Sequence, residues 1–245
     1  MNKDNSAVET VGGFSPAWMI DEQRHVGLEH LDIAYAARYD RKAQHDPTSD
    51  IELLRRRGLN AESLVVDFGA GTGTFAMAVA EHCSKVIAVE PSAAMLAVLG
   101  EKAAAAEVNN LVPIQSGVLS YTHEGPLADF VYSRNALHHL PDFWKALALS
   151  RIADVMKPGA VLYLRDIVYS FDLMDTPLAI EAWIRTGAAS SAEGWTPEEL
   201  AQHVREEHST FSWLMEVMLE RADFEVAEAS FSESAIFAAY LCVKR

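Results

Sequence analysis

The chain has 245 residues, of which 50% are hydrophobic and 22% are charged, with 13 Gly and 9 Pro. This composition is typical of a globular protein and excludes fibrous, low-complexity and fully disordered chains. Because 35 acidic side chains oppose 20 basic ones, the formal net charge is -15, which repels phosphate backbones and anionic membranes. We therefore expect no nucleic-acid partner.

The cysteines and the first residues indicate an intracellular protein. Cys83 and Cys242 lie far apart without metal-ligand spacing, which predicts reduced thiols and a cytoplasmic location. The opening "MNKDNSAVETVGGFSPAW" lacks the apolar centre of a signal peptide. No apolar run approaches the roughly 18 residues of a membrane span, so we expect no membrane insertion.

The first 59 residues precede the expected core. Residues 1–14 are polar and small and are predicted to form a mobile tail. Residues 15–59 are predicted to form N-terminal lid helices, in "SPAWMIDEQRHVGLEHLDIAYAARYD" and "PTSDIELLRRRG". The second helix is expected to end at Gly58, where a positive φ costs glycine little.

From residue 63, apolar β-branched runs alternate with runs of helical spacing. Strands are predicted at "SLVVDFG", "KVIAVE", "NLVPIQS", "ADFVYS" and "AVLYLRD". The helices between them are predicted at "TFAMAVAEHC", "SAAMLAVLGEKAAAA" and "PDFWKALALSRIADVMKPG". This alternation predicts a parallel sheet with right-handed crossovers and helices on both faces.

The last third of the chain departs from this alternation. Residues 168–208 have no strand pattern but many aromatic residues, and they are expected to form a helical cap. Within them "TPEELAQHVREEH" has Thr196 as N-cap, Pro197 at the first helical position and Glu199 to complete a capping box. After the helix "STFSWLMEVMLERAD", the strands "FEVAEASFS" and "AIFAAYLCVKR" are too close for a crossover helix, so they should pair antiparallel.

A glycine-rich turn follows the first strand. In "VVDFGAGTGTF", Gly69 and Gly71 permit a tight turn and a close approach of the backbone to a ligand. Glu90 ends the next strand about 21 positions after Gly69, where an acid can accept both hydroxyls of a ribose. The arrangement predicts an adenosine-containing ligand at the point where the strand order reverses.

Two details concern which adenosine ligand binds. A dinucleotide fingerprint reads G-x-G-x-x-G, whereas Gly69, Gly71 and Gly73 give G-x-G-x-G, with Thr74 at the sixth position. Asp67 places a carboxylate beside the loop, where it would repel a pyrophosphate and stabilise a cation. The residues therefore favour a cationic ligand over a dinucleotide.

In these features the chain resembles the class I S-adenosylmethionine-dependent methyltransferases, in particular the small-molecule, ubiquinone-biosynthesis-like group. The resemblance covers residues 60–166 through "VVDFGAGTG", "VIAVEPSAAML", "ADFVYSRNALHHLPD" and "VMKPGAVLYLRD". It implies an α/β fold, a doubly wound Rossmann-like seven-stranded sheet of order 3-2-1-4-5-7-6, with strand 7 antiparallel and a helical lid. The core would span residues 60–245, with the cap inserted at 168–208.

The resemblance implies S-adenosylmethionine as cofactor and S-adenosylhomocysteine as product. It places methionine beside the glycine loop, ribose at Glu90 and adenine at the end of the third strand. Val118 stands where the family often has an Asp, so backbone amides and Met95 are expected to contact the adenine. The implied cofactor-binding residues are Asp67, Gly69, Ala70, Gly71, Thr72, Glu90, Pro91, Met95, Ser116, Gly117, Val118, Arg134, Asn135 and Tyr39.

Two adjacent histidines occur in "YSRNALHHLPDFW". We expect no metal there, because adjacent side chains diverge and no spaced His or carboxylate partner is evident. A neutral imidazole could remove a proton from the acceptor, and His138 is assigned to the methyl group while His139 is expected to pack. The alternative is that the turn only shapes the cofactor pocket.

The acceptor is expected to be a small neutral or cationic molecule, which receives the sulfonium methyl group by in-line displacement. Alternatives are a nicotinamide-dependent oxidoreductase with a Rossmann fold and a non-catalytic S-adenosylmethionine-binding protein. The chain is expected to act as a monomer or homodimer. Candidate acceptor contacts, for which packing or capping is the alternative role, are Tyr35, His139, Asp166, Trp183 and His208.

Overall fold

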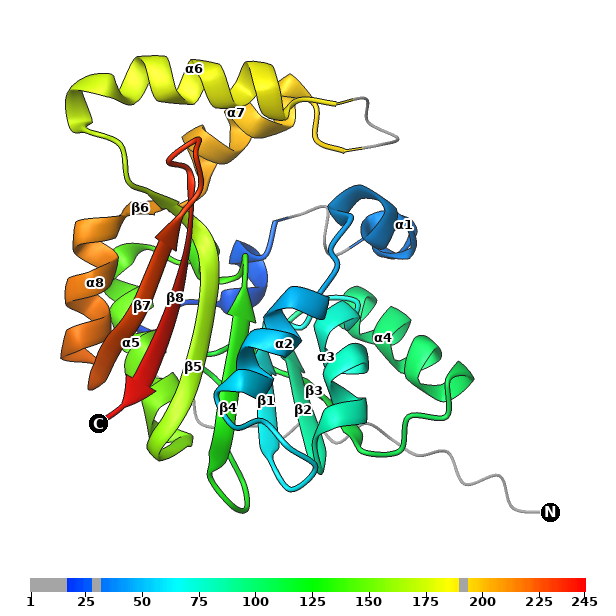
Figure 1. Cartoon of the computed structure of the whole chain (residues 1–245). Helices are drawn as coiled ribbons and strands as arrows, with labels where there is room; N and C mark the ends of the chain where they lie inside the picture. Colours follow the sequence, from blue (N-terminus) through cyan, green and yellow to red (C-terminus); the bar gives the residue numbers. More distant parts are fainter. Residues whose placement is uncertain (1–16, 28–31, 190–193) are drawn as a thin grey trace.

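The computed structural model describes residues 17–27, 32–189 and 194–245. The predicted tail, residues 1–14, lies outside the described residues. A single mixed sheet forms the centre of the molecule (Figure 1). Its strands are β1 (Leu64–Phe68), β2 (Lys85–Glu90), β3 (Leu111–Gln115), β4 (Ala128–Arg134), β5 (Met156–Tyr169), β6 (Thr210–Phe211), β7 (Phe224–Phe231) and β8 (Phe237–Lys244).

The strand order along the sheet is β3-β2-β1-β4-β5-β8-β7. Strands β1 to β5 pair in parallel, whereas β8 is antiparallel to both β5 and β7. The predicted order, with its reversed last strand, is therefore confirmed. The two-residue β6 is additional and pairs with β5, although the sequence predicted helix from Ser209 onward.

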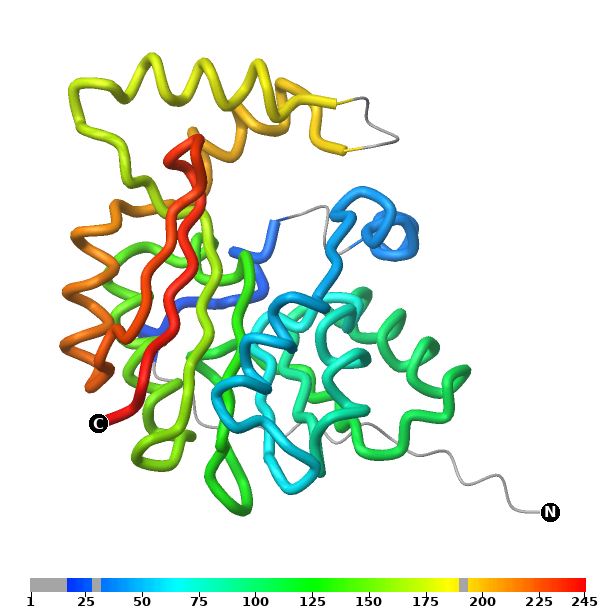
Figure 2. The backbone as a smooth tube through the Cα atoms, viewed as in Figure 1, coloured from blue at the N-terminus to red at the C-terminus, as the bar shows by residue number. Residues whose placement is uncertain are grey.

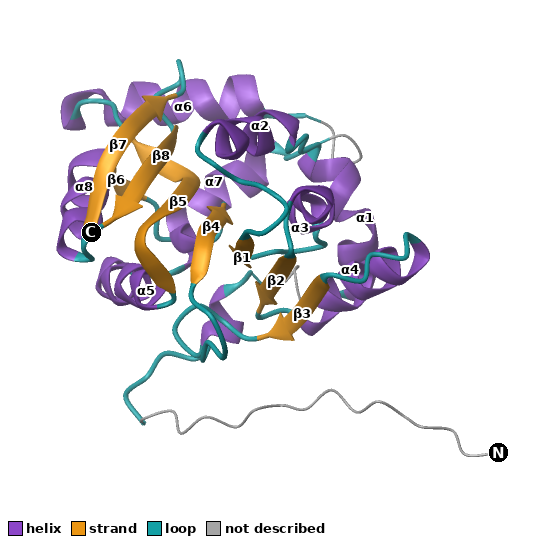
Figure 3. Cartoon of the chain, turned by 60° about the horizontal axis from the view of Figure 1, so that its bottom comes forward, coloured by secondary structure: helices purple, strands orange, loops and turns teal. Residues whose placement is uncertain are grey.

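Helices cover both faces of the sheet, as Figure 3 shows. Val65 faces a cluster with side chains of α2 (Thr48–Arg56), α3 (Thr74–Val79) and α4 (Ala93–Ala105). Its neighbour Val66 faces a second apolar cluster on the opposite face of the sheet, which contains side chains of α5 (Asp142–Asp154) and α8 (Ser212–Arg221). Both residues are fully buried, because consecutive side chains of a strand point to opposite faces. This explains why the strands are continuous apolar runs.

The N-terminal segment and the cap lie beyond the carboxyl ends of the parallel strands (Figure 2). They comprise the 3-10 helix η1 (Glu22–His25), α1 (Ile33–Ala43), η5 (Leu173–Asp175), α6 (Thr176–Gly187) and α7 (Pro197–Glu206). The capping box of α7 is confirmed, since Thr196 and Glu199 bond reciprocally. The proposed division into lid, core and cap stays a prediction.

Several predicted boundaries were wrong. Helix is absent from residues 17–21, and α1 begins only at Ile33 because the Asp32 carboxylate accepts the Tyr35 N–H at 2.7 Å. Helix α5 ends at Asp154, four residues before Pro158, because the chain joins β5 at Met156 and pairs with Ala128. Helix α3 is followed by the 3-10 turn η3 (Ala80–His82).

Within the described ranges, no helix is long and apolar enough to cross a membrane. Both cysteines are buried free thiols. The cytoplasmic location and the monomeric or homodimeric state stay predictions.

Candidate functional site

A cavity opens at the carboxyl edge of the sheet, between β1, β2 and β4. The empty space in and at the mouth of this cavity, open solvent included, is about 740 Å³. This position is the reversal point of the strand order, where ligands bind in open α/β sheets. The predicted cofactor residues that line it are Tyr39, Gly69, Gly71, Glu90, Pro91, Met95, Ser116, Gly117, Val118, Arg134 and Asn135.

The glycine loop is held against the ends of β2 and β4. Gly69 has a φ of 74°, and a Cβ atom there would lie 2.5 Å from the Cβ of Ala136, so only glycine fits. The Gly71 N–H donates to Glu90 Oε2 at 2.8 Å, and the Ser92 N–H donates to Glu90 Oε1 at 2.8 Å. The loop and this acid therefore form one unit facing the cavity.

Glu90 and Asp67 form a buried pair of acids at this unit. Burial, and then the negative charge of Glu90, raises the pKa of Asp67 to about 8. Burial also raises the pKa of Glu90 to about 7, although hydrogen bonds from Ser92 and Gly71 oppose the shift. A cation bound nearby would favour the ionised forms of both carboxyl groups.

Three predicted cofactor residues do not belong to the described lining of the cavity: Asp67, Ala70 and Thr72. Asp67 is 2% exposed and lies behind the lining. The Thr72 hydroxyl donates to Asp40 of α1, and Lys102 of α4 donates to Asp40 and to the Thr72 carbonyl. Thr72 therefore connects the glycine loop to two helices rather than to the cavity.

Glu22 lines the cavity and was missed by sequence reasoning. Its carboxylate accepts from the Leu119 N–H at 2.9 Å and from the Ser120 N–H at 3.0 Å. Burial raises its pKa, while these hydrogen bonds and that of the Ser120 hydroxyl lower it. It lies directly against Gly117. Nothing in the sequence pairs residue 22 with a turn near residue 118, so only the fold could reveal this acid.

Of the two adjacent histidines, His139 lines the cavity and His138 does not belong to its described lining. His139 lines the cavity beside Ala136, Leu137 and Leu140, whereas His138 is absent from the described lining and is 5% exposed. They belong to the 3-10 turn η4 (Leu137–His139), and the centroids of their rings lie 4.2 Å apart. The prediction that His138 is nearer the methyl group is thus not supported by its position.

Asp166 explains why His138 turns inward. This carboxylate accepts from the backbone N–H groups of Leu137 and His138 at 2.8 and 3.2 Å, and pairs with His138 Nδ1 at 2.5 Å. Burial lowers the pKa of His138, but Asp166 and Glu207 outweigh it and raise the value to about 9. Asp166 thus caps the η4 turn and does not belong to the described cavity lining.

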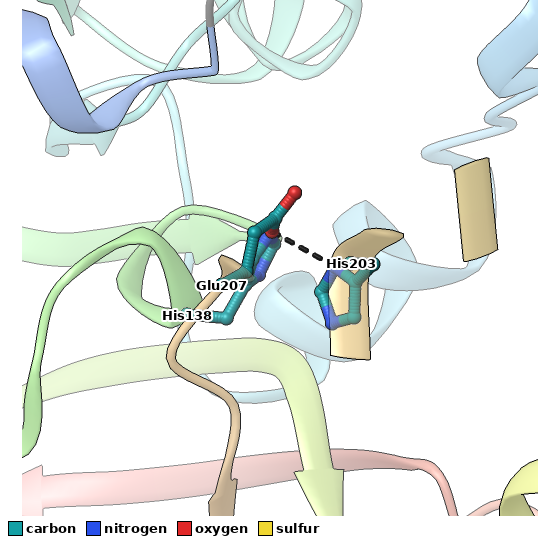
Figure 4. Close-up of side chains that lie close together, drawn as sticks. All are labelled: His138, His203 and Glu207. Atoms are coloured by element: carbon teal, nitrogen blue, oxygen red, sulfur yellow. Dashed lines mark ion pairs between the residues drawn. The ribbon is translucent and has the colours of Figure 1, made fainter. Parts of the chain in front are cut away.

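His138 also has the spaced partners that the sequence did not reveal. Its Nε2 atom lies 3.0 Å from Oε2 of Glu207, and His203 Nδ1 lies 2.8 Å from the same oxygen (Figure 4). His203 is on α7 and Glu207 follows that helix directly. The premise used against a metal site, that no spaced histidine or carboxylate lies nearby, is therefore wrong.

The remaining predicted acceptor contacts lie outside the described cavity lining. Tyr35 packs in the cluster of Ala36 and Met95. Trp183 of α6 is 6% exposed and meets the His203 ring edge to face at 5.6 Å. The His208 ring lies 6.2 Å from that of His25, which does line the cavity. His208 is thus placed behind the lining.

Known proteins resemble this chain in sequence and fold. Residues 65–159 match the family model of a methyltransferase domain. An uncharacterized methyltransferase from Exiguobacterium sibiricum is 29% identical over 176 residues, covering 71% of this chain and 74% of that protein. Magnesium protoporphyrin IX methyltransferase from Synechocystis, solved with bound S-adenosylmethionine, has a TM-score of 0.64 and 14% identity, covering 93% of this chain and 99% of that chain.

The [4+2]-cyclase SpnF is similar in structure too, with a TM-score of 0.60 and 14% identity over 80% of each chain. Likeness at such identities shows the fold alone, so the reaction must be argued from the site. The sheet order, glycine loop and acid after β2 define a protein of the methyltransferase fold. The match to the methyltransferase domain model over residues 65–159 and the methyltransferase relatives support a class I S-adenosylmethionine-dependent methyltransferase over the nicotinamide-dependent alternative.

Proposed function

We propose that the chain transfers the sulfonium methyl group of S-adenosylmethionine to a small-molecule acceptor by in-line displacement. The observation that carries this proposal is the cavity itself. It joins the glycine loop, Glu90 and the 116–118 turn, which the family uses for methionine, ribose and adenine, in one continuous lining. The cofactor supplies an activated methyl group, and the chain supplies position and exclusion of water.

We assign the residues that line the cavity to separate parts of the cofactor, its ribose and its adenine. Glu90 retains lone pairs for the ribose hydroxyls beside its bonds to Gly71 and Ser92. Where the family often has an Asp at position 118, Glu22 brings a carboxylate to the same turn, and we assign it to the adenine end. Tyr39 of α1 and Met95 of α4 both line the cavity, and we assign them to cover the cofactor.

The acceptor end is assigned to the part of the lining that the cofactor residues do not use: His25, Val26, His139 and Leu140. These side chains offer two imidazoles and an apolar surface, which suit a small molecule that carries one ionisable group. The methyl donor is already activated, so correct alignment supplies much of the rate. We place His139, rather than His138, where a proton of the acceptor would be removed.

Cofactor choice is tested by thermal unfolding with ligands. S-adenosylhomocysteine at ~100 times its Kd should stabilise the fold by about 2.7 kcal/mol, with no response to NAD. Release of S-adenosylhomocysteine from S-adenosylmethionine is then measured with pools of phenols, amines and carbon acids. Stabilisation by NAD alone would refute S-adenosylmethionine as the cofactor. Binding of S-adenosylhomocysteine, without its formation from S-adenosylmethionine in any pool of acceptors, would favour the non-catalytic alternative.

A further inference from the structure

Three side chains from two segments far apart in the chain meet beside the cavity wall. They are His138 from the η4 turn of the core, His203 from α7 of the cap, and Glu207 just after α7. His138 Nε2, His203 Nδ1 and a carboxylate oxygen of Glu207 all lie within 4.8 Å of one another. His138 and His203 are buried and Glu207 is half-buried, and Figure 4 shows the three side chains gathered together.

The contacts within this cluster have the length of hydrogen bonds but not their alignment. Glu207 Oε2 lies 3.0 Å from His138 Nε2 and 2.8 Å from His203 Nδ1. Nevertheless, this buried oxygen accepts no well-directed hydrogen bond from the described residues. Ligand atoms about 2.1 Å from one metal ion lie roughly 3.0 to 3.4 Å apart in octahedral or tetrahedral geometry, with their lone pairs directed at the ion rather than at each other. The distances from the Glu207 oxygen to the two imidazole nitrogens are close to the lower end of this range, and the contacts lack hydrogen-bond alignment.

The outer nitrogen of each imidazole is held by a separate group. His138 Nδ1 lies 2.5 Å from Asp166, which also accepts two backbone N–H groups and therefore makes Nδ1 the protonated nitrogen. His203 Nε2 lies 2.8 Å from the Ser209 hydroxyl. Such outer hydrogen bonds orient metal-bound histidines and present the inner nitrogen to the ion.

We propose that His138 Nε2, His203 Nδ1 and the Glu207 carboxylate bind a divalent transition-metal ion, with Zn²⁺ as the reference. Two imidazoles and one carboxylate suit such ions, whereas Mg²⁺ and Ca²⁺ prefer oxygen ligands alone. The double charge of the ion balances the carboxylates of Glu207 and Asp166 in this buried place. His139 Nδ1, 3.5 Å from Glu207 Oε2, stands at the edge of the site and on the cavity lining.

The ion would join the cap to the core. His138 lies between β4 and α5, whereas His203 and Glu207 belong to α7 and its end. One backbone bond, from the His208 N–H to the His138 carbonyl at 2.8 Å, already joins these segments. Metal binding should therefore slow proteolysis of residues 170–208 without changing cleavage elsewhere.

The test uses the untagged full chain, freed of metal with a chelator and titrated with Co²⁺ and Zn²⁺. We expect one Co²⁺ per chain, with visible absorption bands typical of nitrogen and oxygen ligands, and displacement of Co²⁺ by Zn²⁺. Glu207→Gln and His203→Gln should remove this binding. Ser209→Ala should weaken it about 10- to 100-fold, because it loses only an outer hydrogen bond.

The control is His82→Gln, in η3, which lies outside the cluster and should bind Co²⁺ as the parent does. Far-UV circular dichroism of each variant verifies that it is folded, and Glu207 is the position best suited to substitution because it is half-buried. The proposal is overturned if no saturable 1:1 binding occurs, or if the variants bind with parental affinity. It does not rest on methyl transfer, because its readouts are metal binding and proteolysis.

Discussion

The glycine-loop side and the cap side of the cavity are built differently. On the glycine-loop side, the groups that face the ligand follow β1, β2 and β3 in chain order, each at the carboxyl end of a strand. On the cap side, His138 of the core contacts His203 and Glu207, which lie more than 60 residues later in the chain, in the cap. The first arrangement repeats a local pattern, whereas the second exists only when the cap packs on the core.

The comparison also explains the two histidines of the η4 turn. His139 lines the cavity, whereas His138 does not belong to the described lining, although their ring centroids lie only 4.2 Å apart. Asp166 caps the turn from β5 and pairs with the His138 ring. Substitutions on the two sides should therefore affect different measurements.

The largest effect is expected from Glu90→Ala on the glycine-loop side. The variant loses the carboxylate that holds Gly71 and faces the ribose, so most of the ~2.7 kcal/mol stabilisation by saturating S-adenosylhomocysteine should disappear. Glu101→Ala, on an exposed position of α4, is the matched control. An unchanged thermal shift in Glu90→Ala would refute the ribose assignment.

Next in size is His139→Ala, which tests the assignment of the acceptor end. With an acceptor identified by S-adenosylhomocysteine release, kcat/KM should fall about 10²-fold, as expected for loss of a proton-transfer group. Cofactor stabilisation should be retained, and His82→Ala should behave as the parent. If His139→Ala turns over normally and a folded His138→Gln does not, the assignment made from the sequence would be restored.

A smaller, pH-dependent effect is expected from Asp67→Asn. The folded pKa of Asp67, about 8, exceeds its ordinary value of 3.8, so the cofactor-free fold binds this proton more tightly than the unfolded chain does. The stability contributed by Asp67 is therefore full at low pH and declines as the pH rises toward 8. Asparagine cannot ionise, so the variant should unfold at a higher temperature than the parent near pH 8, with a smaller difference near pH 5.

Thermal unfolding without ligand measures this difference, and Asp154→Asn on the exposed end of α5 is the control. If the unfolding temperatures of variant and parent differed equally at pH 5 and at pH 8, the raised pKa of Asp67 would be contradicted. The same variant should lose more affinity for S-adenosylmethionine than for S-adenosylhomocysteine, because only the former carries a positive sulfur.

The smallest effect is expected from Thr196→Ala on the cap side. It removes the hydroxyl that caps α7 and should destabilise that helix by about 1 kcal/mol. Denaturant unfolding measures the loss, and Thr186→Ala, near the end of α6, is the control. Cofactor stabilisation should not change, because α7 does not belong to the described cavity lining. A weaker response to S-adenosylhomocysteine would show that the two sides are coupled.

Much of the molecule could be predicted from the sequence. The strands were evident because burial on both faces requires continuous apolar runs, as in β1 and β2. The cofactor side was evident because Gly69 and Glu90 follow consecutive strands whose ends meet at one edge. The reversed β8 was evident because its connection to β7 is too short for a helix.

Only the tertiary structure decided the rest. Glu22 reaches the turn at Gly117, and Glu207 reaches His138, because the N-terminal segment and the cap fold over the same edge of the sheet. Neither contact could be predicted from a periodicity or a residue spacing in the sequence. The sequence by itself determined the sheet and the glycine loop, since these depend on short-range patterns. The direction of His138 and the grouping of His138, His203 and Glu207 depend on packing between segments far apart in the chain.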